Sequence, residues 1–532
     1  MVRMTSGLLR CGVALLVAVA GSSTFGHGAA DTMDWPRFRG PLGNGVAEAA
    51  LPESWSKTDN VRWAIDVPGR GWSSPIIWKG VVYVTSAISN KPFKQPSPGL
   101  YGNDYIAELR AKGIPPAEVS RMVRERDNEV PSESDEIRYM VYAFDAATGR
   151  TLWEREAHKG LPFGGRHRKN TYASETPFTD GQRLYVSFGQ NIGMFAFTLD
   201  GTPLWKQTWD PQRIYLDFGT ASSPVVHDGK VFLLQDSEEQ SFLTALDAAT
   251  GKQLWRTPRA SEGLLHSSWN TPYVWTHPDR TEIVVTGHHS VRSYSLSGEE
   301  LWRVTIAGTT MPTPSAFAVN GMLYVGTGAQ GGDASRPFFA IRPGAKGDIS
   351  LAGDATSNEF VAWVHPRASG YTPSPVYVDG RLFLLHDTGI MAVLDAETGK
   401  ELYKARVGGL GHTFSASPIV ANGRIYFFDE EGTTIVVKPA GEYTEIRQNS
   451  LDEMTLATPA VADHSLFIRT ETRLYRIGSP IQSGHAGVVG SPLSNPPSAG
   501  QRRNGHRLRS GRHEAGSPRR DQVPARLPQS RP

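Results

Sequence analysis

The segment Ala143-Phe-Asp-Ala-Ala-Thr-Gly-Arg-Thr-Leu-Trp153 decides the fold, because the chain repeats it. Near copies close on Trp255 and on Tyr403. Shortened or diverged copies close on three further tryptophans, Trp205, Trp302 and Trp363. Each copy places a tight turn, Asp followed by Thr-Gly, between two apolar strands, which predicts a β-hairpin.

A second hairpin precedes each of these copies. Ser-Pro or Thr-Pro stands eight residues before an aromatic residue in six copies, as in Ser74-Pro75 before Tyr83. Two looser copies begin at Thr271 and Thr313. Asp-Gly or Asn-Gly pairs between proline and aromatic favour two-residue turns with positive φ at both positions. The chain therefore contains eight repeats of four strands and roughly 45 residues, the size of a propeller blade.

The last repeat is incomplete, which indicates how the ring closes. Residues 458–478 supply three strands, and an unassigned strand around Trp63 stands near the N-terminus. We predict an all-β, eight-bladed β-propeller over about residues 34–478, with the Trp63 strand pairing beside Leu474 and Tyr475. A blade shared by both ends of the chain leaves no open gap in the ring. The aromatic residues expected to dock between blades are Trp63, Trp153, Trp205, Trp255, Trp302, Trp363 and Tyr403.

The Ala-x-Asp-x-x-Thr-Gly-x-x-x-Trp element resembles the tryptophan-docking motif of the PQQ-binding-like β-propeller repeat family. This family includes quinoprotein alcohol dehydrogenases and the propeller lipoprotein of the outer-membrane β-barrel assembly machine. Residues 35–41, 69–75 and 341–348 are similar to an exported bacterial subfamily of unassigned role. The resemblance implies the propeller fold for residues 34–478 but is weak evidence for an activity.

Composition excludes several other classes of protein. The chain has 532 residues and one cysteine, Cys11, so disulfide frameworks and thiolate metal sites are excluded. Its formal net charge is +2, yet residues 481–532 carry nine arginines and two acidic residues. The body of the chain is therefore acidic, which argues against nucleic acid as a partner.

The two ends of the chain differ from the body. Residues 1–30 combine Arg3 and Arg10 with an apolar run too short to span a bilayer, which predicts a signal peptide. We therefore expect a periplasmic or secreted protein without a transmembrane segment. Residues 479–532 are rich in Pro, Gly, Ser and Arg, so we expect a disordered basic tail. A basic arm that binds anionic surfaces stays open as an alternative for this tail.

Blade 1 carries an insertion, residues 88–138, between its second and third strands. Residues 104–112 and 117–126 within it are expected to be helical. Because strand direction alternates within a blade, the insertion should overhang the channel end at which the innermost strands begin. Blade 5 has a shorter insertion on that face, 329–336, and a long outer hairpin, 343–359. The alternative is that the blade 1 insertion is a decoration without function.

Polar and aromatic residues gather in the segments that lead into the innermost strands. These segments converge on one end of the channel, which predicts a ligand site there. Aromatic faces with interleaved Arg and His suit a planar, sugar-like or acidic ligand. The alternative is that the side chains only fill the channel. The candidate residues are Arg70, Trp72, Arg168, Tyr172, Glu175, Asp217, Trp269, Tyr371 and His412.

Three classes of function stay open. The first is an exported, non-catalytic binding or assembly scaffold in the cell envelope, a monomer whose partner is a protein, a small molecule or a glycan. The second is a quinoprotein dehydrogenase, for which the resemblance implies PQQ, calcium held by side-chain oxygens, an aspartate base and, commonly, an adjacent cysteine pair. The third is a polysaccharide lyase or hydrolase, suggested only by carboxylates and tryptophans near the channel mouth.

The cysteine content favours the first class. The chain has no adjacent cysteine pair and no Cys-x-x-Cys-His haem site. We expect no catalytic residue, no metal and no cofactor, with PQQ and calcium only under the dehydrogenase alternative.

Overall fold

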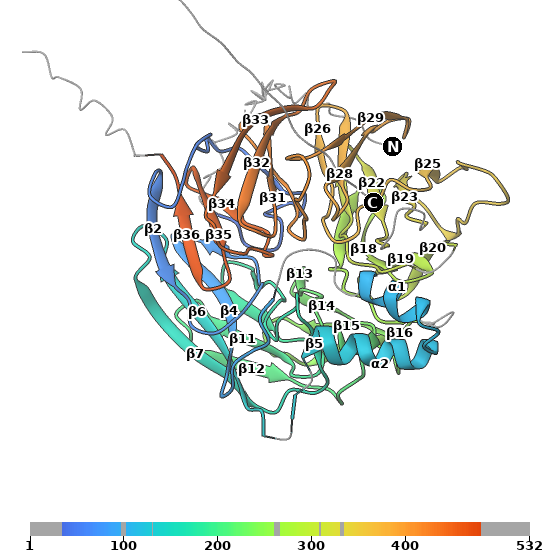
Figure 1. Ribbon diagram of the computed structural model, residues 1–532. Helices are drawn as coiled ribbons and strands as arrows, with labels where there is room; N and C mark the ends of the chain where they lie inside the picture. The colour runs from blue at the N-terminus through green and yellow to red at the C-terminus, as the bar shows by residue number, and fades with distance from the viewer. Residues whose placement is uncertain are drawn as a thin grey trace, which may run out of the picture. The chain divides into compact units, whose positions relative to one another are not determined.

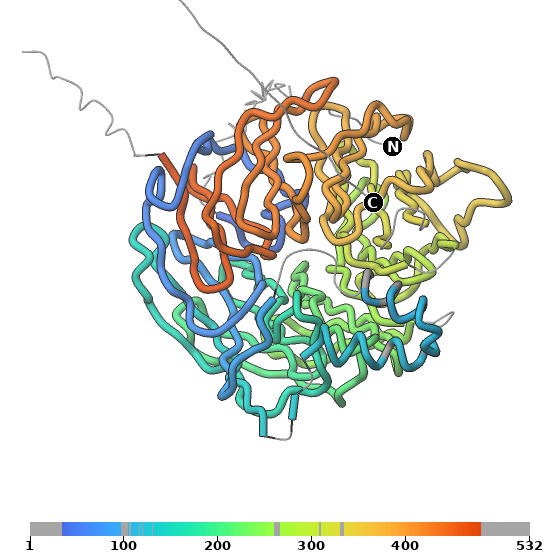
Figure 2. Tube along the Cα trace, viewed as in Figure 1, coloured from blue at the N-terminus to red at the C-terminus, as the bar shows by residue number. Residues whose placement is uncertain are grey.

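Eight antiparallel β-sheets surround a central channel in the computed structural model (Figure 1). The structure describes residues 34–96, 103–129, 131–132, 134–259, 266–307, 310–329 and 335–479. The chain passes through the blades in sequence order, once around the ring (Figure 2). The predicted all-β, eight-bladed propeller is confirmed.

The first four blades each run from the innermost to the outermost strand. Blade 1 contains β3 (Ile76–Trp78), β4 (Val81–Ser89), β6 (Ile137–Asp145) and β7 (Thr151–Gly160). Blade 2 contains β9 (Phe178–Thr179), β10 (Arg183–Ser187), β11 (Met194–Thr198) and β12 (Pro203–Gln207). Blade 3 contains β13 (Val225–His227), β14 (Lys230–Gln235), β15 (Phe242–Asp247) and β16 (Gln253–Pro258). Blade 4 contains β17 (Tyr273–His277), β18 (Arg280–Thr286), β19 (Ser290–Ser295) and β20 (Glu300–Thr305).

The other four blades follow the same order. Blade 5 contains β21 (Phe317–Val319), β22 (Met322–Gly326), β23 (Phe338–Ile341) and β25 (Val361–His365). Blade 6 contains β26 (Val376–Val378), β27 (Arg381–Leu385), β28 (Ile390–Asp395) and β29 (Glu401–Arg406). Blade 7 contains β30 (Ile419–Ala421), β31 (Arg424–Phe428), β32 (Thr433–Lys438) and β33 (Thr444–Ser450). Blade 8 contains β34 (Ala460–Ala462), β35 (Ser465–Arg469), β36 (Arg473–Ile477) and, from the N-terminal side, β2 (Val61–Asp66).

The ring closes through blade 8, as the incomplete repeat predicts. β2 pairs antiparallel with β36, and Ala64 lies opposite Tyr475. The outer strand of this blade therefore comes from a part of the chain about 400 residues away from its partner in sequence. Both ends of the propeller must be in place before the last sheet is complete.

The predicted hairpin turns form in most blades. Asp228 and Gly229 both have positive φ, of 47° and 67°, as a two-residue turn of this type requires. Blade 2 differs, because Gly181 has a positive φ whereas Asp180 is not among the residues with positive φ. There the strands pair only as far as Thr179 and Leu184, so the connection is longer than the predicted two residues.

The outer strands of most blades carry an aromatic residue that contacts the next blade. The indole Nε1 of Trp205 donates to the carbonyl of Ala248 at 3.1 Å. Gly251 lies under this indole, where a Cβ atom would sit 2.5 Å from ring carbons, and its φ of 72° also favours glycine. Corresponding bonds join Trp63 to Ala146, Trp153 to Leu199, Trp255 to Leu296, Trp363 to Ala396 and Tyr403 to Ala440.

Trp302 does not make the corresponding contact. Its ring is fully buried, and its Nε1 donates to Oε2 of Glu282 in its own blade at 3.1 Å. A short strand of the blade 5 hairpin, β24 (Gly347–Asp348), pairs in parallel with β20 and adds a fifth strand to blade 4. Trp302 still packs in one buried cluster with Leu323 and Val325 of blade 5, so it lies between blades and differs from the other tryptophans in its hydrogen bond only.

Residues 34–47 cross the channel near the far ends of the innermost strands, and we call this segment the channel plug. Trp35 bridges to Ile77 in blade 1, and the carbonyl of Pro36 accepts from Thr179 N in blade 2 at 2.9 Å. The plug ends in β1 (Val46–Ala47), which pairs in parallel with β30 of blade 7. The plug thus closes the channel from the end opposite to the predicted ligand site.

The blade 1 insertion contains two helices, α1 (Asn103–Ala111) and α2 (Pro116–Asp127), close to the predicted ranges. It also contributes β5 (Asn128–Glu129), which pairs with β8 (Arg166–His167) of the loop before blade 2. A 3-10 turn, η1 (Tyr215–Asp217), lies between blades 2 and 3. Asn128 Nδ2 donates to Leu216 O in this turn at 2.5 Å, so the insertion spans from blade 1 to the loop before blade 3.

Two predictions about the ends of the chain lie outside the described residues. These are the signal peptide at 1–30 and all but the first residue of the basic tail at 479–532. Within the described part of the chain, neither helix is long and apolar enough to cross a membrane.

Candidate functional site

A cavity of about 470 Å³ occupies the channel at the end where the innermost strands begin. Phe38 of the channel plug lines it from below. Val123 and Asp127 of α2 line it from the other side, so the insertion overhangs this end of the channel, as strand direction predicts. The channel is therefore a chamber with a floor and a partial roof, and its volume is typical of small-molecule sites.

Aromatic side chains from several blades form the walls of this cavity. Trp72, Trp269 and Tyr371, all predicted site residues, line it together with Tyr215 and Phe218. Trp269 is fixed by a hydrogen bond from its Nε1 to the carbonyl of Gly219 at 2.7 Å. The Nε1 of Trp72 is buried and has no partner among the described residues. Large aromatic walls with a few polar groups are typical of sites for small organic molecules.

Eight hydroxyl side chains, one from each blade, surround the cavity just before the innermost strands. In six places a backbone N–H of one blade donates to the hydroxyl oxygen of the next, as from Ser74 N to Thr176 Oγ1 at 3.0 Å. In blade 5, Ser315 holds this position and not the predicted Thr313, because Ser315 N donates to Ser374 Oγ at 3.0 Å. We call this set the hydroxyl ring: Ser74, Thr176, Ser223, Thr271, Ser315, Ser374, Ser417 and Thr458.

A buried ion pair joins blade 2 to blade 7 in the wall of the cavity. Lys169 Nζ lies 2.7 and 2.8 Å from the carboxylate oxygens of Glu430, whose side chain is fully buried. Glu430 also accepts from Ser415 Oγ at 2.6 Å and from Thr413 Oγ1 at 3.0 Å. Several donors are needed to compensate a buried carboxylate, and Glu430 has them. Nearby, burial and then the charge of Lys169 lower the pKa of His167 to about 3, so this imidazole is neutral at pH 7.

Asp387 is the second carboxylate in the cavity wall, and its surroundings differ from those of Glu430. It lies between β27 and β28, is 3% exposed, and neither of its oxygens has a hydrogen-bond partner among the described residues. Its Oδ1 lies 2.7 Å from Nδ1 of His386 without hydrogen-bond alignment, and that Nδ1 interacts with Thr388 Oγ1 at 3.0 Å. Burial and then the charge of Asp387 raise the pKa of Tyr371. A buried carboxylate without hydrogen-bond donors is costly, and both oxygens of Asp387 are also buried from the cavity, beside the His386 imidazole.

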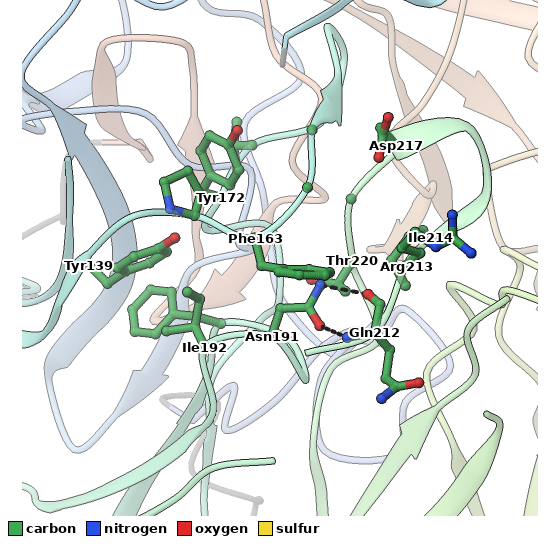
Figure 3. A pocket seen from close by; sticks show the side chains of 16 residues that line it. Tyr139, Phe163, Tyr172, Asn191, Ile192, Gln212, Arg213, Ile214, Asp217 and Thr220 are labelled. Carbon is green, nitrogen blue, oxygen red and sulfur yellow. Dashed lines mark hydrogen bonds between the residues drawn. The ribbon is translucent and has the colours of Figure 1, made fainter. Parts of the chain in front are cut away.

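Two predicted residues, Tyr172 and Asp217, line a smaller pocket beside the cavity (Figure 3). Its volume is about 30 Å³, enough for a water-sized group only. The hydroxyls of Tyr172 and Tyr139 are buried there without a partner among the described residues. These two tyrosines therefore fit an internal water site better than a site for an organic ligand.

The other predicted residues lie outside the cavity lining and contact other protein groups. Arg70 pairs with Glu471 at 2.6 Å, and Arg168 Nε donates to the carbonyl of Gln95 at 3.2 Å. His412 Nδ1 lies 2.5 Å from Asp429 Oδ2, and burial raises the pKa of Asp429 although His412 opposes this. Glu175 is buried and accepts from Thr220 Oγ1 at 2.5 Å, and burial raises its pKa to about 7.

The structure thus brings three of the nine predicted residues together in the cavity, and their role in binding stays a prediction. The prediction of an acidic ligand rested on Arg70, Arg168 and His412, and these three side chains contact other protein groups outside the cavity lining. Sequence reasoning missed Asp387, Phe38, and the contacts of Lys169 with Glu430. The only signal for Asp387 was a polar segment, His386-Asp387-Thr388-Gly389, directly after an apolar strand.

Blades joined by tryptophan contacts of this kind define a PQQ-like repeat propeller. A family model described as "Outer membrane protein assembly factor BamB" matches residues 138–319 and 287–443. These ranges include more than half of the chain, and the chain belongs to this family.

The individual relatives share only about a quarter of their residues with this chain over the matched regions. Quinohemoprotein alcohol dehydrogenase ADH IIB of Pseudomonas putida is 26% identical over 313 residues, which are 53% of this chain and 41% of the relative. Outer membrane protein assembly factor BamB of Yersinia pestis is 23% identical over 271 residues, 44% of this chain and 68% of the relative. The chain therefore matches less than half the length of the dehydrogenase.

A solved structure supports the fold. The crystal structure of quinohemoprotein alcohol dehydrogenase from Comamonas testosteroni superposes with a TM-score of 0.53 at 12% identity. The match covers 88% of this chain and 84% of that one. At this identity the likeness shows the fold alone.

Proposed function

We propose that this protein is an exported, non-catalytic binding propeller whose ligand binds in the channel cavity. The observation that carries the proposal is the partly roofed chamber, with Phe38 of the channel plug below and α2 above. An open channel would need neither element. The aromatic walls formed by Trp72, Trp269 and Tyr371 support a small organic ligand in this chamber.

Export and location in the periplasm belong to the same proposal. Residues 1–30 have the composition of a signal peptide, and the family description names an outer-membrane assembly factor. A role as an assembly scaffold is compatible with a ligand site at the channel mouth, since the outer faces of the blades stay available to a protein partner.

The calcium that the dehydrogenase resemblance implies does not fit the residues of the cavity. Calcium takes six to eight oxygen ligands. Asp127 accepts hydrogen bonds from Nε and Nη2 of Arg126, at 2.6 and 2.8 Å, and Glu430 is paired with Lys169. Asp387 is therefore the one cavity carboxylate without hydrogen bonds among the described residues. The described residues also contain no group of three or more His, Cys, Asp or Glu side chains suited to a metal. We therefore derive no redox step for this protein.

A variant that fills the cavity tests the proposed function. Ala221 lines the cavity, and Ala221→Phe should reduce its volume, whereas Ala147→Phe changes an exposed turn on the outside of blade 1. A panel of neutral, cationic and anionic small molecules is screened by ligand-observed NMR against the mature protein and both variants. Binding to the wild type and to Ala147→Phe, but not to Ala221→Phe, is the expected result. Binding that survives Ala221→Phe, or no binding by any compound, would overturn the proposal.

A further inference from the structure

Two arginines of the channel plug, Arg37 and Arg39, carry charges that no described acidic side chain neutralises. Arg39 is 1% exposed, and its Nη2 donates to the carbonyl of Asn44 at 3.0 Å and to that of Pro375. Its Nε and Nη1 are buried without a partner in the described part of the chain. Arg37 is partly buried, and its Nε donates to the carbonyl of Gly40 at 3.2 Å. The hydrogen bonds of both side chains thus go to backbone carbonyls, and no described carboxylate pairs with either.

Aromatic rings lie beside these two guanidinium groups. The Cζ of Arg37 lies 6.0 Å from the centre of the Phe178 ring, and the Cζ of Arg39 lies 5.7 Å from the centre of the Phe317 ring. Tyr273 lies near both arginines, since burial raises its pKa and the two arginine charges oppose this. Charges inside a protein are normally paired, because an unpaired charge in an apolar region is costly. The floor of the channel therefore carries an excess of positive charge.

A small cavity lies beside Arg37, next to the channel cavity but separate from it. Its volume is about 20 Å³, enough for one water molecule or a single-atom ion. Phe38, Thr271 and Ser315 line both cavities. A Cβ atom at Gly43, which also lines the small cavity, would lie 3.0 Å from Nη2 of Arg37. Glycine at this position therefore leaves room beside the guanidinium group.

The polar side chains around this small cavity can donate hydrogen bonds. A guanidinium group only donates, and the two Nη groups of Arg37 make no hydrogen bond to the described residues. The hydroxyl oxygen of Thr271 accepts from Ser223 N at 3.2 Å, so its proton is still available, and Ser315 also has a hydroxyl proton. None of the residues that line the cavity is acidic. Hydrogen-bond donors around a positive charge favour an anion over a neutral water molecule or a cation.

We propose that this cavity binds chloride, which neutralises Arg37 and joins the channel plug to blades 3, 4 and 5. Val225, Tyr273 and Ala316 line the cavity from these three blades. Oxyanions such as sulfate and phosphate need more room than a cavity for one water-sized particle provides. The site is separate from the channel cavity, so the inference does not depend on the proposed function. Because chloride would bind only where the plug and the ring meet, it should stabilise the folded protein.

The first test measures thermal unfolding of the mature protein in sodium chloride and in sodium gluconate, whose anion is too large for the cavity, at equal ionic strength. Chloride should raise the melting temperature by about 2–5 °C, with an effect that saturates as its concentration rises. Arg37→Gln should abolish the difference between the salts. Arg62→Gln changes an exposed arginine of β2 and should keep it. Equal melting temperatures of the wild type in both salts, or a chloride effect that persists in Arg37→Gln, would overturn the proposal.

The second test needs no variant and so does not depend on how well Arg37→Gln folds. Crystals of the wild-type protein are soaked in sodium bromide, and diffraction is measured at the bromine absorption edge. An anomalous difference peak should appear between Arg37 and Tyr273. The absence of a peak there would overturn the proposal. A peak without any stabilisation by chloride would show an adventitious ion only and would overturn it equally.

Discussion

The outer seams between blades and the inner wall of the channel come from the same eight repeats, yet they are built differently. At the outer seams, five tryptophans donate to the next blade at 3.0 to 3.1 Å, and glycines such as Gly251 lie under the rings. Along the channel, the hydroxyl ring is repeated in every blade. The segments leading into it differ, with Trp72 in blade 1, Lys169 before blade 2 and Tyr371 in blade 6.

This difference separates stability from function. A contact repeated at almost every seam serves all blades equally, so its purpose is to join them. A side chain that is not repeated in every blade and breaks a local rule is expected where a protein binds or reacts, and Asp387, whose carboxylate accepts no hydrogen bond from the described residues, is an example. The predictions below test whether the seams and the channel wall divide these two tasks.

The largest effect is expected at an outer seam. Trp255→Ala should lower the free energy of unfolding by about 3–5 kcal/mol, because it opens a space between blades 3 and 4 and removes the bond to Leu296. Trp72→Ala should cost clearly less, since one side of this ring already faces the cavity. Urea denaturation of both variants measures the difference. Equal losses would mean that the channel wall contributes as much to stability as the seams do.

Glu175, buried close to the channel, should make stability depend on pH. Its pKa of about 7 lies above its ordinary value of 4.5, so the folded protein binds more protons than the unfolded chain between these values. The free energy of unfolding should therefore fall as pH rises from about 4.5 to 7, by roughly 3 kcal/mol from this group. Glu175→Gln should remove this part of the fall, measured by urea denaturation at pH 5 and pH 8. The exposed control Glu48→Gln should keep the wild-type pH dependence.

The hydroxyl ring should contribute to stability only where it links blades. Thr176→Val leaves the buried N–H of Ser74 without its acceptor and should cost about 1–2 kcal/mol. Ser315→Ala removes a ring hydroxyl that accepts no such bond and should cost less. The urea denaturation midpoints of the two variants, compared at an unchanged m-value, measure this difference in stability. If Ser315→Ala were the more damaging, the inter-blade bonds would not explain the repeated Ser-Pro and Thr-Pro pairs.

The sequence was sufficient to predict what the repeats share. The eight blades, the closure through Trp63 and Tyr475, and the helices of the insertion all follow from periodic patterns and turn residues. The fifth strand of blade 4, β24, was not predicted, because it comes from an irregular hairpin with no counterpart in the other blades. A local pattern does not show which distant segment will cover a strand.

The candidate site was predicted less well, for a related reason. Position in the loops identified Trp72, Trp269 and Tyr371, but it could not show that Arg70 and His412 are paired with Glu471 and Asp429. These pairs join residues up to 401 positions apart. Phe38 was missed because nothing in its sequence neighbourhood indicates that residues 34–47 cross the channel. The Arg70–Glu471 pair and the position of Phe38 are contacts between distant parts of the chain, whereas His412 and Asp429 meet within blade 7 across two of its loops.

The smallest stability effect, and the sharpest contrast, is expected for two aspartates of blade 6. Asp395, in the outer turn, accepts from both N and Oγ1 of Thr398 at 2.8 and 2.7 Å, and these bonds lower its pKa. Asp395→Ala should therefore cost about 1 kcal/mol.

Asp387, in the channel wall, has no such donors among the described residues, and its burial as a charged group is itself unfavourable. Asp387→Ala should leave the free energy of unfolding at pH 8 unchanged within about 0.5 kcal/mol, or raise it, because it removes a buried carboxylate that accepts no hydrogen bond from the described residues. Urea denaturation of both variants beside the wild type is the measurement. A loss for Asp387→Ala as large as that for Asp395→Ala would mean that this carboxylate stabilises the fold, and the division between seam and channel would fail at Asp387.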